Sequence, residues 1–210
     1  MRQKHQHRSA SAAVALMLTG LLAWPAAGLA QLASTTPTVT GQATAVRATV
    51  LGLLGTATTT TLSDTGSLGG TSDARDASQL IGSIPSLLGG EVLSATTIGY
   101  PNKVDSAASL AGLNLNVAGV GISADFVMVQ ASQVLGATGS GTSYIDNLSV
   151  NGSPIAVTGQ PNQTVAIPGG QIVINEQTIS QSGATVVNAL HVIVNGVADV
   201  VIASATAGIS

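Results

Sequence analysis

The polar residues with the most chemical potential in this chain lie close together near its C-terminus. Asn175, Glu176, Asn188 and His191 stand among valines and isoleucines. Amide and carboxylate groups in such apolar surroundings must find hydrogen-bond partners. We therefore predict that these residues form a fixed polar network that serves the architecture. The alternative is a ligand site at one end of the sheets.

His191 is the residue most open to a catalytic interpretation. Together with Asp199 and a serine it could build an acyl-transfer triad. The chain has no Gly-x-Ser-x-Gly motif, however, and a hairpin offers no turn that would expose a nucleophile. Both alternating faces of residues 186–194 are apolar, which favours a buried neutral imidazole bonded to a carbonyl or carboxylate. We predict no catalytic residue, no cofactor and no enzymatic activity.

Three aspartates, Asp64, Asp73 and Asp76, occur in a segment rich in glycine and serine. Carboxylate oxygens are the ligands that Ca²⁺ prefers. The spacing lacks the Asp-x-Asp-x-Asp-Gly order of a dedicated calcium loop. A solvated loop is the favoured interpretation, with a calcium site as the alternative.

Turn signals define the elements that must position these residues. Asn151-Gly152 and Asn195-Gly196 each separate two apolar runs, and this dipeptide is typical of type I′ hairpins. Pro168-Gly169-Gly170 marks a third turn between apolar runs. The last third of the chain therefore predicts an antiparallel sheet.

The rest of the chain reads as further short strands. Strands are predicted over 38–54, 56–62 and 91–98, loops or connections over 63–78 and 136–143, and either a helical turn or an irregular edge segment over 80–88. Apolar residues then alternate on odd positions from Leu113 to Val117 and on even positions from Val120 through Phe126 to Met128. This change of phase predicts a β-bulge or a bend between sheets at Gly119.

These elements predict an all-β domain, either an antiparallel two-sheet sandwich of jelly-roll-like type or a closed barrel, with little helix. Beyond residue 30 the only aromatic residues are Tyr100, Phe126 and Tyr144. The core must therefore consist of Val, Ile, Leu and Ala. Stacking platforms for sugars or for single-stranded nucleic acids are scarce.

Several strings of the chain resemble the choice-of-anchor P family. They are YIDNLSVNG (144–152), PNQTV (161–165), INEQ (174–177), VNALHV (187–192) and ADVVIASA (198–205). The resemblance runs from about Thr38 to Ile209. It implies an exported bacterial domain, often attached to the cell surface, with no established activity and no catalytic residues to carry over.

The N-terminus has the organisation of a Sec signal peptide. Arg2, Lys4 and Arg8 precede an apolar stretch, 10–24, and small residues lead to a cleavage site after Ala30. The apolar stretch is shorter than the roughly 20 residues that a membrane span needs. The predicted organisation is a cleaved signal peptide at 1–30, a mobile segment at 31–37 and a single β-domain at 38–210.

The mature chain would be acidic. It keeps three basic residues against nine acidic ones, a formal charge of −6, which disfavours nucleic-acid partners. It has no cysteine, so neither disulfides nor a lipoprotein anchor can form. The C-terminal residues carry no sorting signal, and we expect free secretion or attachment through a partner.

The function predicted from these features is that of a secreted, non-enzymatic structural or adhesive domain, acting through its surface or its edge strands. Its partners would be a cell-surface protein or glycan, or a second copy of itself. The alternative is an extracellular module that binds a small ligand or a glycan at the loops 64–76 or 136–143.

Overall fold

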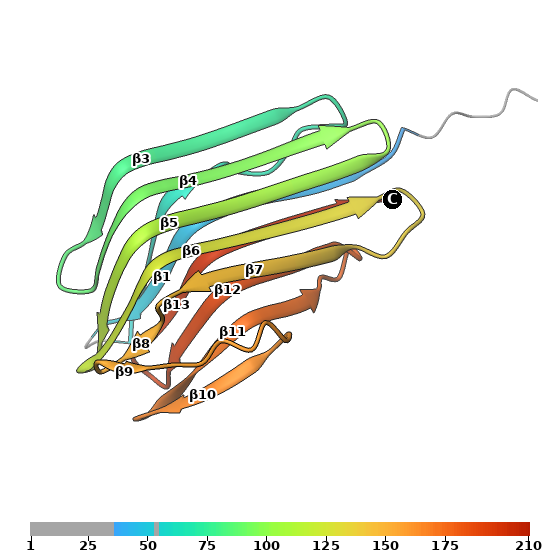
Figure 1. Cartoon of the computed structure of the whole chain (residues 1–210). Helices are drawn as coiled ribbons and strands as arrows, with labels where there is room; N and C mark the ends of the chain where they lie inside the picture. The colour runs from blue at the N-terminus through green and yellow to red at the C-terminus, as the bar shows by residue number, and fades with distance from the viewer. Residues whose placement is uncertain (1–35, 53–54) are drawn as a thin grey trace, which may run out of the picture. The chain divides into compact units, whose positions relative to one another are not determined.

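The computed structural model describes residues 36–52 and 55–210, which form two antiparallel β-sheets packed face to face (Figure 1). The all-β sandwich is confirmed, and the closed barrel is wrong because the two sheets remain separate. Within the described ranges no helix is long and apolar enough to cross a membrane. The predicted signal peptide, its cleavage site and residues 31–35 and 53–54 lie outside these ranges.

Sheet A contains six strands in the order β10-β11-β12-β13-β1-β2. The bounds are β1 (Val39–Leu51), β2 (Ala57–Asp64), β10 (Gln163–Ile167), β11 (Gly170–Ile179), β12 (Thr185–Val194) and β13 (Ala198–Ile209). Strands that follow one another in the chain are neighbours, with one long-range exception. β1 pairs along its length with β13, so the two ends of the described chain lie side by side at the centre of the sheet.

Sheet B contains seven strands in the order β3-β4-β5-β6-β8-β9, and β7 also pairs with β6. The bounds are β3 (Ala74–Ile84), β4 (Leu88–Tyr100), β5 (Lys103–Val117), β6 (Val120–Val134), β7 (Ser140–Asp146), β8 (Ser149–Val150) and β9 (Ser153–Pro154). Most neighbours again follow chain order. Both sheets are therefore largely meanders, without the crossed connections between sheets that define a jelly roll.

Two of the three predicted turns form as expected. Asn151 and Gly152 have φ angles of 50° and 76°, as a type I′ turn requires, and Pro168-Gly169 joins β10 to β11. The type I′ prediction for Asn195-Gly196 is wrong. Val194 pairs with Ala198, which leaves three residues in that connection, and only Gly196 has a positive φ.

The predicted bulge at Gly119 is a tight turn instead. Ala118 and Gly119 have φ angles of 50° and 78°, and Val117 pairs directly with Val120 across a two-residue hairpin. Residues directly opposite each other in an antiparallel pair share one face of the sheet. A two-residue hairpin therefore moves the inward-facing positions from odd to even numbers. A β-bulge leaves the same pattern in the sequence.

Of the two alternatives for 80–88, the edge segment is right for residues 80–84, whereas 85–87 form a turn and Leu88 begins β4. β3 runs from Ala74 to Ile84 at the edge of sheet B, so the predicted loop 63–78 ends at Asp73. Residues 140–143, predicted as part of a connection, belong to β7.

In each long strand the inward-facing residues change from even to odd positions, or from odd to even, at one level of the sandwich. We call this level the crease. In β5 the buried residues lie on even positions up to Leu110 and on odd positions from Leu113. In β6 the switch falls between Ala124 and Val127. Phe126 and Met128 consequently lie on the outer face, and the prediction that they continue the buried pattern is wrong.

The two sheets make this switch in opposite ways. In sheet A two consecutive residues face inward: Ala45 and Val46, Ile174 and Asn175, Ala189 and Leu190, and Ile202 and Ala203. In sheet B two consecutive residues face outward: Leu80 and Ile81, Glu91 and Val92, Ala111 and Gly112, and Asp125 and Phe126.

The crease bends the whole sandwich. Left-handed residues occur along it in both sheets, among them Asn175 and Ala203 (φ 51° each) in sheet A and Gly112 (φ 58°) in sheet B. A face that carries an extra side chain is the longer one, and a sheet curves away from it. The inner face of sheet A and the outer face of sheet B are therefore both convex, and Figure 1 shows strands of both sheets turning in the same sense.

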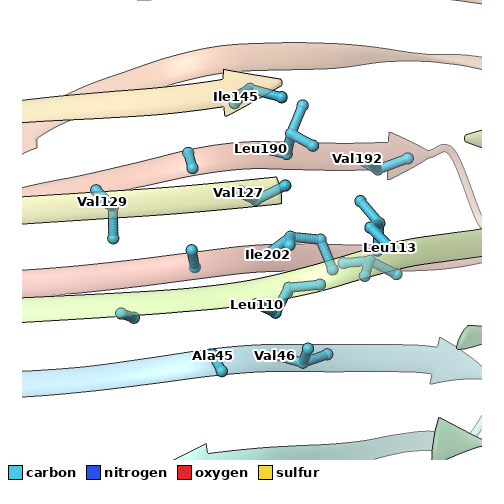
Figure 2. Close-up of a cluster of buried hydrophobic side chains, with 14 of the residues drawn as sticks. Ala45, Val46, Leu110, Leu113, Val127, Val129, Ile145, Leu190, Val192 and Ile202 are labelled. Carbon is cyan, nitrogen blue, oxygen red and sulfur yellow. The ribbon is translucent and has the colours of Figure 1, made fainter. Parts of the chain in front are cut away.

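The crease also divides the core into two halves. On one side, large side chains such as Leu113, Leu115, Ile122, Ile172 and Leu190 fill the interior. On the other side, small residues dominate: Gly41, Ala43, Ala95, Ser106, Ala108, Ala131, Ala205 and Ala207. Figure 2 shows the junction, where Leu110 and Leu113 meet Val46 and Ile202 from the other sheet.

In the small-residue half the sheets approach closely. A Cβ atom on Gly41 of β1 would overlap Thr97 Oγ1 of β4 in the other sheet. Ser106 Oγ in sheet B donates to the Thr206 carbonyl in sheet A at 2.6 Å, and Thr97 Oγ1 lies 2.7 Å from Ser106 Oγ. These buried hydroxyls thereby satisfy one another across the thin core.

This close approach predicts a steep cost for adding volume at Gly141. A Cβ atom there would overlap Val187 Cγ2 of the opposite sheet. We expect Gly141→Ala to destabilise the domain by roughly 1–3 kcal/mol. Gly89→Ala is the matched control, because a Cβ on that strand glycine meets nothing within 4 Å. Urea unfolding of both variants checks the prediction, and equal stabilities would contradict it.

Candidate functional site

Three of the four predicted network residues meet on the outer face of sheet A. Glu176 Oε2 accepts a hydrogen bond from Asn188 Nδ2 at 2.6 Å and lies 2.9 Å from His191 Nδ1. On the far side of the imidazole, His191 Nε2 lies 3.2 Å from Asp199 Oδ2. The cluster therefore alternates carboxylate, imidazole and carboxylate across β11, β12 and β13.

Asn175 does not belong to this cluster. It lies on the inner face at the crease, 3 % exposed, where its Nδ2 donates to the Gly159 carbonyl at 3.1 Å. Its Oδ1 accepts from Gln177 Nε2 at 3.0 Å. Neighbouring residues of a strand face opposite sides, so Asn175 and Glu176 cannot share one network. The alternation of side chains along a strand already indicates, from the sequence, that Asn175 and Glu176 lie on different faces.

The geometry around His191 leaves no nitrogen for a nucleophile. Each ring nitrogen faces a carboxylate, and both contacts are hydrogen bonds when the imidazole carries two protons. The side chain is 16 % exposed. Within the described ranges no serine or threonine hydroxyl is hydrogen-bonded to it, so His191 and Asp199 do not form a nucleophilic triad there.

The three aspartates do not come together: Asp64 ends β2, Asp73 lies in the connection and Asp76 belongs to β3. Asp64 Oδ1 accepts from Gln42 Nε2 at 3.0 Å and from the Gly66 amide at 2.8 Å. Asp73 Oδ2 accepts from the Gly69 amide at 2.6 Å and from Arg75 Nε at 2.8 Å. In the part of the chain that the structure describes, no three acidic or histidine side chains are grouped to hold a metal ion, and Asp76 does not join Asp64 and Asp73.

A hollow of about 250 Å³ lies beside the cluster on the outer face of sheet A. Its lining includes Thr44, Arg47, Asp64, Asn188, Ser204 and Thr206. The strand register sets Asp64, Thr44, Ser204, Asn188 and Glu176 opposite one another in a single row across five strands. The hollow lies at the crease because that face of sheet A is concave. Sequence reasoning missed Arg47 and Ser204, whose proximity depends on β1 pairing with β13.

We compared the chain with protein-family models, with curated proteins and with solved structures, and nothing matches in any of the three. The resemblance to the choice-of-anchor P family stays a prediction, and the site is interpreted from its geometry alone.

Glu176 is the residue on which the cluster depends. Glu176→Ala removes the acceptor of both Asn188 Nδ2 and His191 Nδ1, leaving partly buried donors without a partner. We expect a loss of roughly 1–3 kcal/mol of unfolding free energy, seen as a lower melting temperature. Asp199→Asn is the control, since the Asp199 side chain is 52 % exposed, and it should change little. An unchanged melting temperature for Glu176→Ala would refute a structural role.

The loop after β2 has an acid-sensitive contact. The Gly69 amide, and then the Arg75 side chain, hold the pKa of Asp73 below its usual value near 3.8. Stability from this carboxylate is present above pH 3.8 and is lost as pH falls through the lower folded value. We expect the Gly69 amide resonance in NMR spectra to titrate below pH 3.8. Asp73→Asn should abolish that titration, and a midpoint at or above 3.8 would contradict the assignment.

Proposed function

We propose that this chain is an exported, non-enzymatic structural or adhesive domain of the bacterial cell surface or extracellular space, and that it associates through edge strand β3. The observation that carries the proposal is the exposed apolar centre of this strand. Leu80 and Ile81 are 77 % and 75 % exposed, the highest values among the large apolar residues that the structure describes. Val92 on the neighbouring strand extends the patch at 57 % exposure.

The backbone of β3 supports pairing with another strand. Within the described ranges its only ladder partner is β4, which leaves the other edge of this 11-residue strand open. From Ala77 to Ile84 the strand has no charge and no proline, the two devices that commonly protect an edge. β10 and β9 are shorter edges, with five and two residues, and β9 ends in Pro154.

The crease makes β3 complementary to a second copy of itself. Leu80 and Ile81 both face outward, and inward-facing Gln79 and Gly82 flank them. The order of faces therefore reads the same in both directions from the midpoint between Leu80 and Ile81. An antiparallel pair of β3 strands about a two-fold axis there places Leu80 opposite Ile81 of the other copy. Inward residues then meet inward residues, so the two inner faces continue across the junction.

Other features support the proposal that the domain is exported and has no enzymatic activity. The N-terminal segment has the charge, apolar stretch and small residues of a signal peptide. Both ring nitrogens of His191 face carboxylates, and among the described residues no hydroxyl is hydrogen-bonded to the imidazole. The family resemblance points to the same kind of exported domain.

Replacing the apolar centre of β3 tests the proposal. We expect purified mature protein to form dimers in sedimentation equilibrium over the micromolar range, and Leu80→Lys/Ile81→Lys to be monomeric, because facing lysines repel each other and oppose edge pairing. The exposed positions should leave the melting temperature nearly unchanged.

Thr58→Lys on edge strand β2 is the matched control and should still dimerise. A wild-type protein that stays monomeric throughout this range would overturn the second copy as the partner. Equal dimerisation of the wild type and the double variant would overturn β3 as the interface.

A further inference from the structure

The hollow on sheet A has opposite charges that do not neutralise each other. Arg47 is the only cationic residue in its lining and Asp64 the only carboxylate. Among the described residues neither takes part in an ion pair. Asp64 Oδ1 is occupied by Gln42 and the Gly66 amide, whereas its second oxygen forms no hydrogen bond within the described chain. Two charged groups thus share one hollow without contacting each other.

Asn188 also lines this hollow. The residue is 7 % exposed, and its Oδ1 is buried without a hydrogen-bond partner. Its Nδ2 donates to Glu176 on β11, and the residue lies opposite Ser204 of β13, which also lines the hollow. Asn188 therefore gives the hollow an uncharged polar wall that is held in place by Glu176.

We propose that this hollow binds a small zwitterion of amino-acid size. The ligand carboxylate pairs with the Arg47 guanidinium, which offers a two-pronged donor. The ligand ammonium donates to the second carboxylate oxygen of Asp64, which has no hydrogen-bond partner within the described chain. Hydroxyls of Thr44 and Ser204 line the hollow and can donate or accept.

Other ligand classes fit the lining less well. A simple anion would face Asp64 and a simple cation would face Arg47, so each would meet one repulsive charge. A neutral sugar would leave both charges unmatched, and no aromatic ring lines the hollow to stack on a pyranose.

A second hollow, of about 430 Å³ on the outer face of sheet B, does not share these features. It contains Lys103 and Asp105, which pair with each other at 2.8 Å. This contact raises the pKa of Lys103 above its usual value. The charges there are already satisfied within the protein, which makes this hollow a useful internal comparison.

Titration of the folded domain with matched probes tests the proposal. The probes are L-serine, L-serine methyl ester, which lacks the carboxylate, N-acetyl-L-serine, which lacks the ammonium, and D-glucose. Calorimetry and amide chemical shifts report binding and its location. We expect L-serine to bind more tightly than either half-charged analogue, with shifts at Asn188, Ser204 and Thr206 and none around Lys103.

Variants separate the hollow from an effect of net charge. Arg47→Gln and Asp64→Asn should each weaken L-serine binding about tenfold or more, the loss of one charged hydrogen bond. Arg75→Gln removes an exposed arginine outside the hollow and should bind as the wild type does. If Asp64→Asn disturbs the turn at Gly66, Ser204→Ala is the variant of the hollow that tests serine binding in its place.

Each contrary result overturns a defined part of the proposal. Binding of glucose but not of serine overturns the ligand class, and no binding of any probe overturns the site. Equal loss in Arg47→Gln and Arg75→Gln overturns the role of the hollow. The inference is independent of edge pairing, because Leu80→Lys/Ile81→Lys leaves the lining intact and should bind serine as the wild type does.

Discussion

Side chains on a β-strand alternate between its two faces, and this sandwich requires the alternation to shift once in every long strand at the same level. A shift in a single strand would turn half of its apolar residues toward water. Sheet A resolves this by turning two neighbouring residues inward, as at Ala45 and Val46, and sheet B by turning two outward, as at Asp125 and Phe126. The two sheets can bend together because the extra inward residue lengthens the inner face of sheet A, while the extra outward residue shortens the inner face of sheet B relative to its outer face.

The bend determines what the surface offers. On its concave side, the outer face of sheet A hollows between Thr44 and Arg47, and the residues of five strands come into one polar row. On its convex side, Leu80 and Ile81 are both turned out of sheet B. The same constraint therefore produces the recess for which we propose a zwitterion and the symmetric edge for which we propose a second copy of the chain.

Local sequence signals succeeded where the chemistry was itself local. Asn151-Gly152 adopts the type I′ turn because both residues tolerate positive φ and the flanking runs meet across two residues. The change of phase at Gly119 does not distinguish a hairpin from a bulge, since both leave the same apolar pattern. Glu176, Asn188 and His191 contact one another on the outer face, whereas Asn175 faces inward and bonds to Gly159, because neighbouring residues of a strand point to opposite faces.

By itself, the sequence determined an all-β domain with a Val, Leu, Ile and Ala core and the places where its C-terminal strands reverse. These properties follow from side-chain type, turn chemistry and spacing along one strand. Tertiary structure alone decided that β1 lies beside β13, that the core is thin on one side of the crease, and that Arg47, Asp64 and Asn188 share a recess. The physical reason is that these contacts depend on the register between strands far apart in the chain, which hydrogen bonding and packing select together.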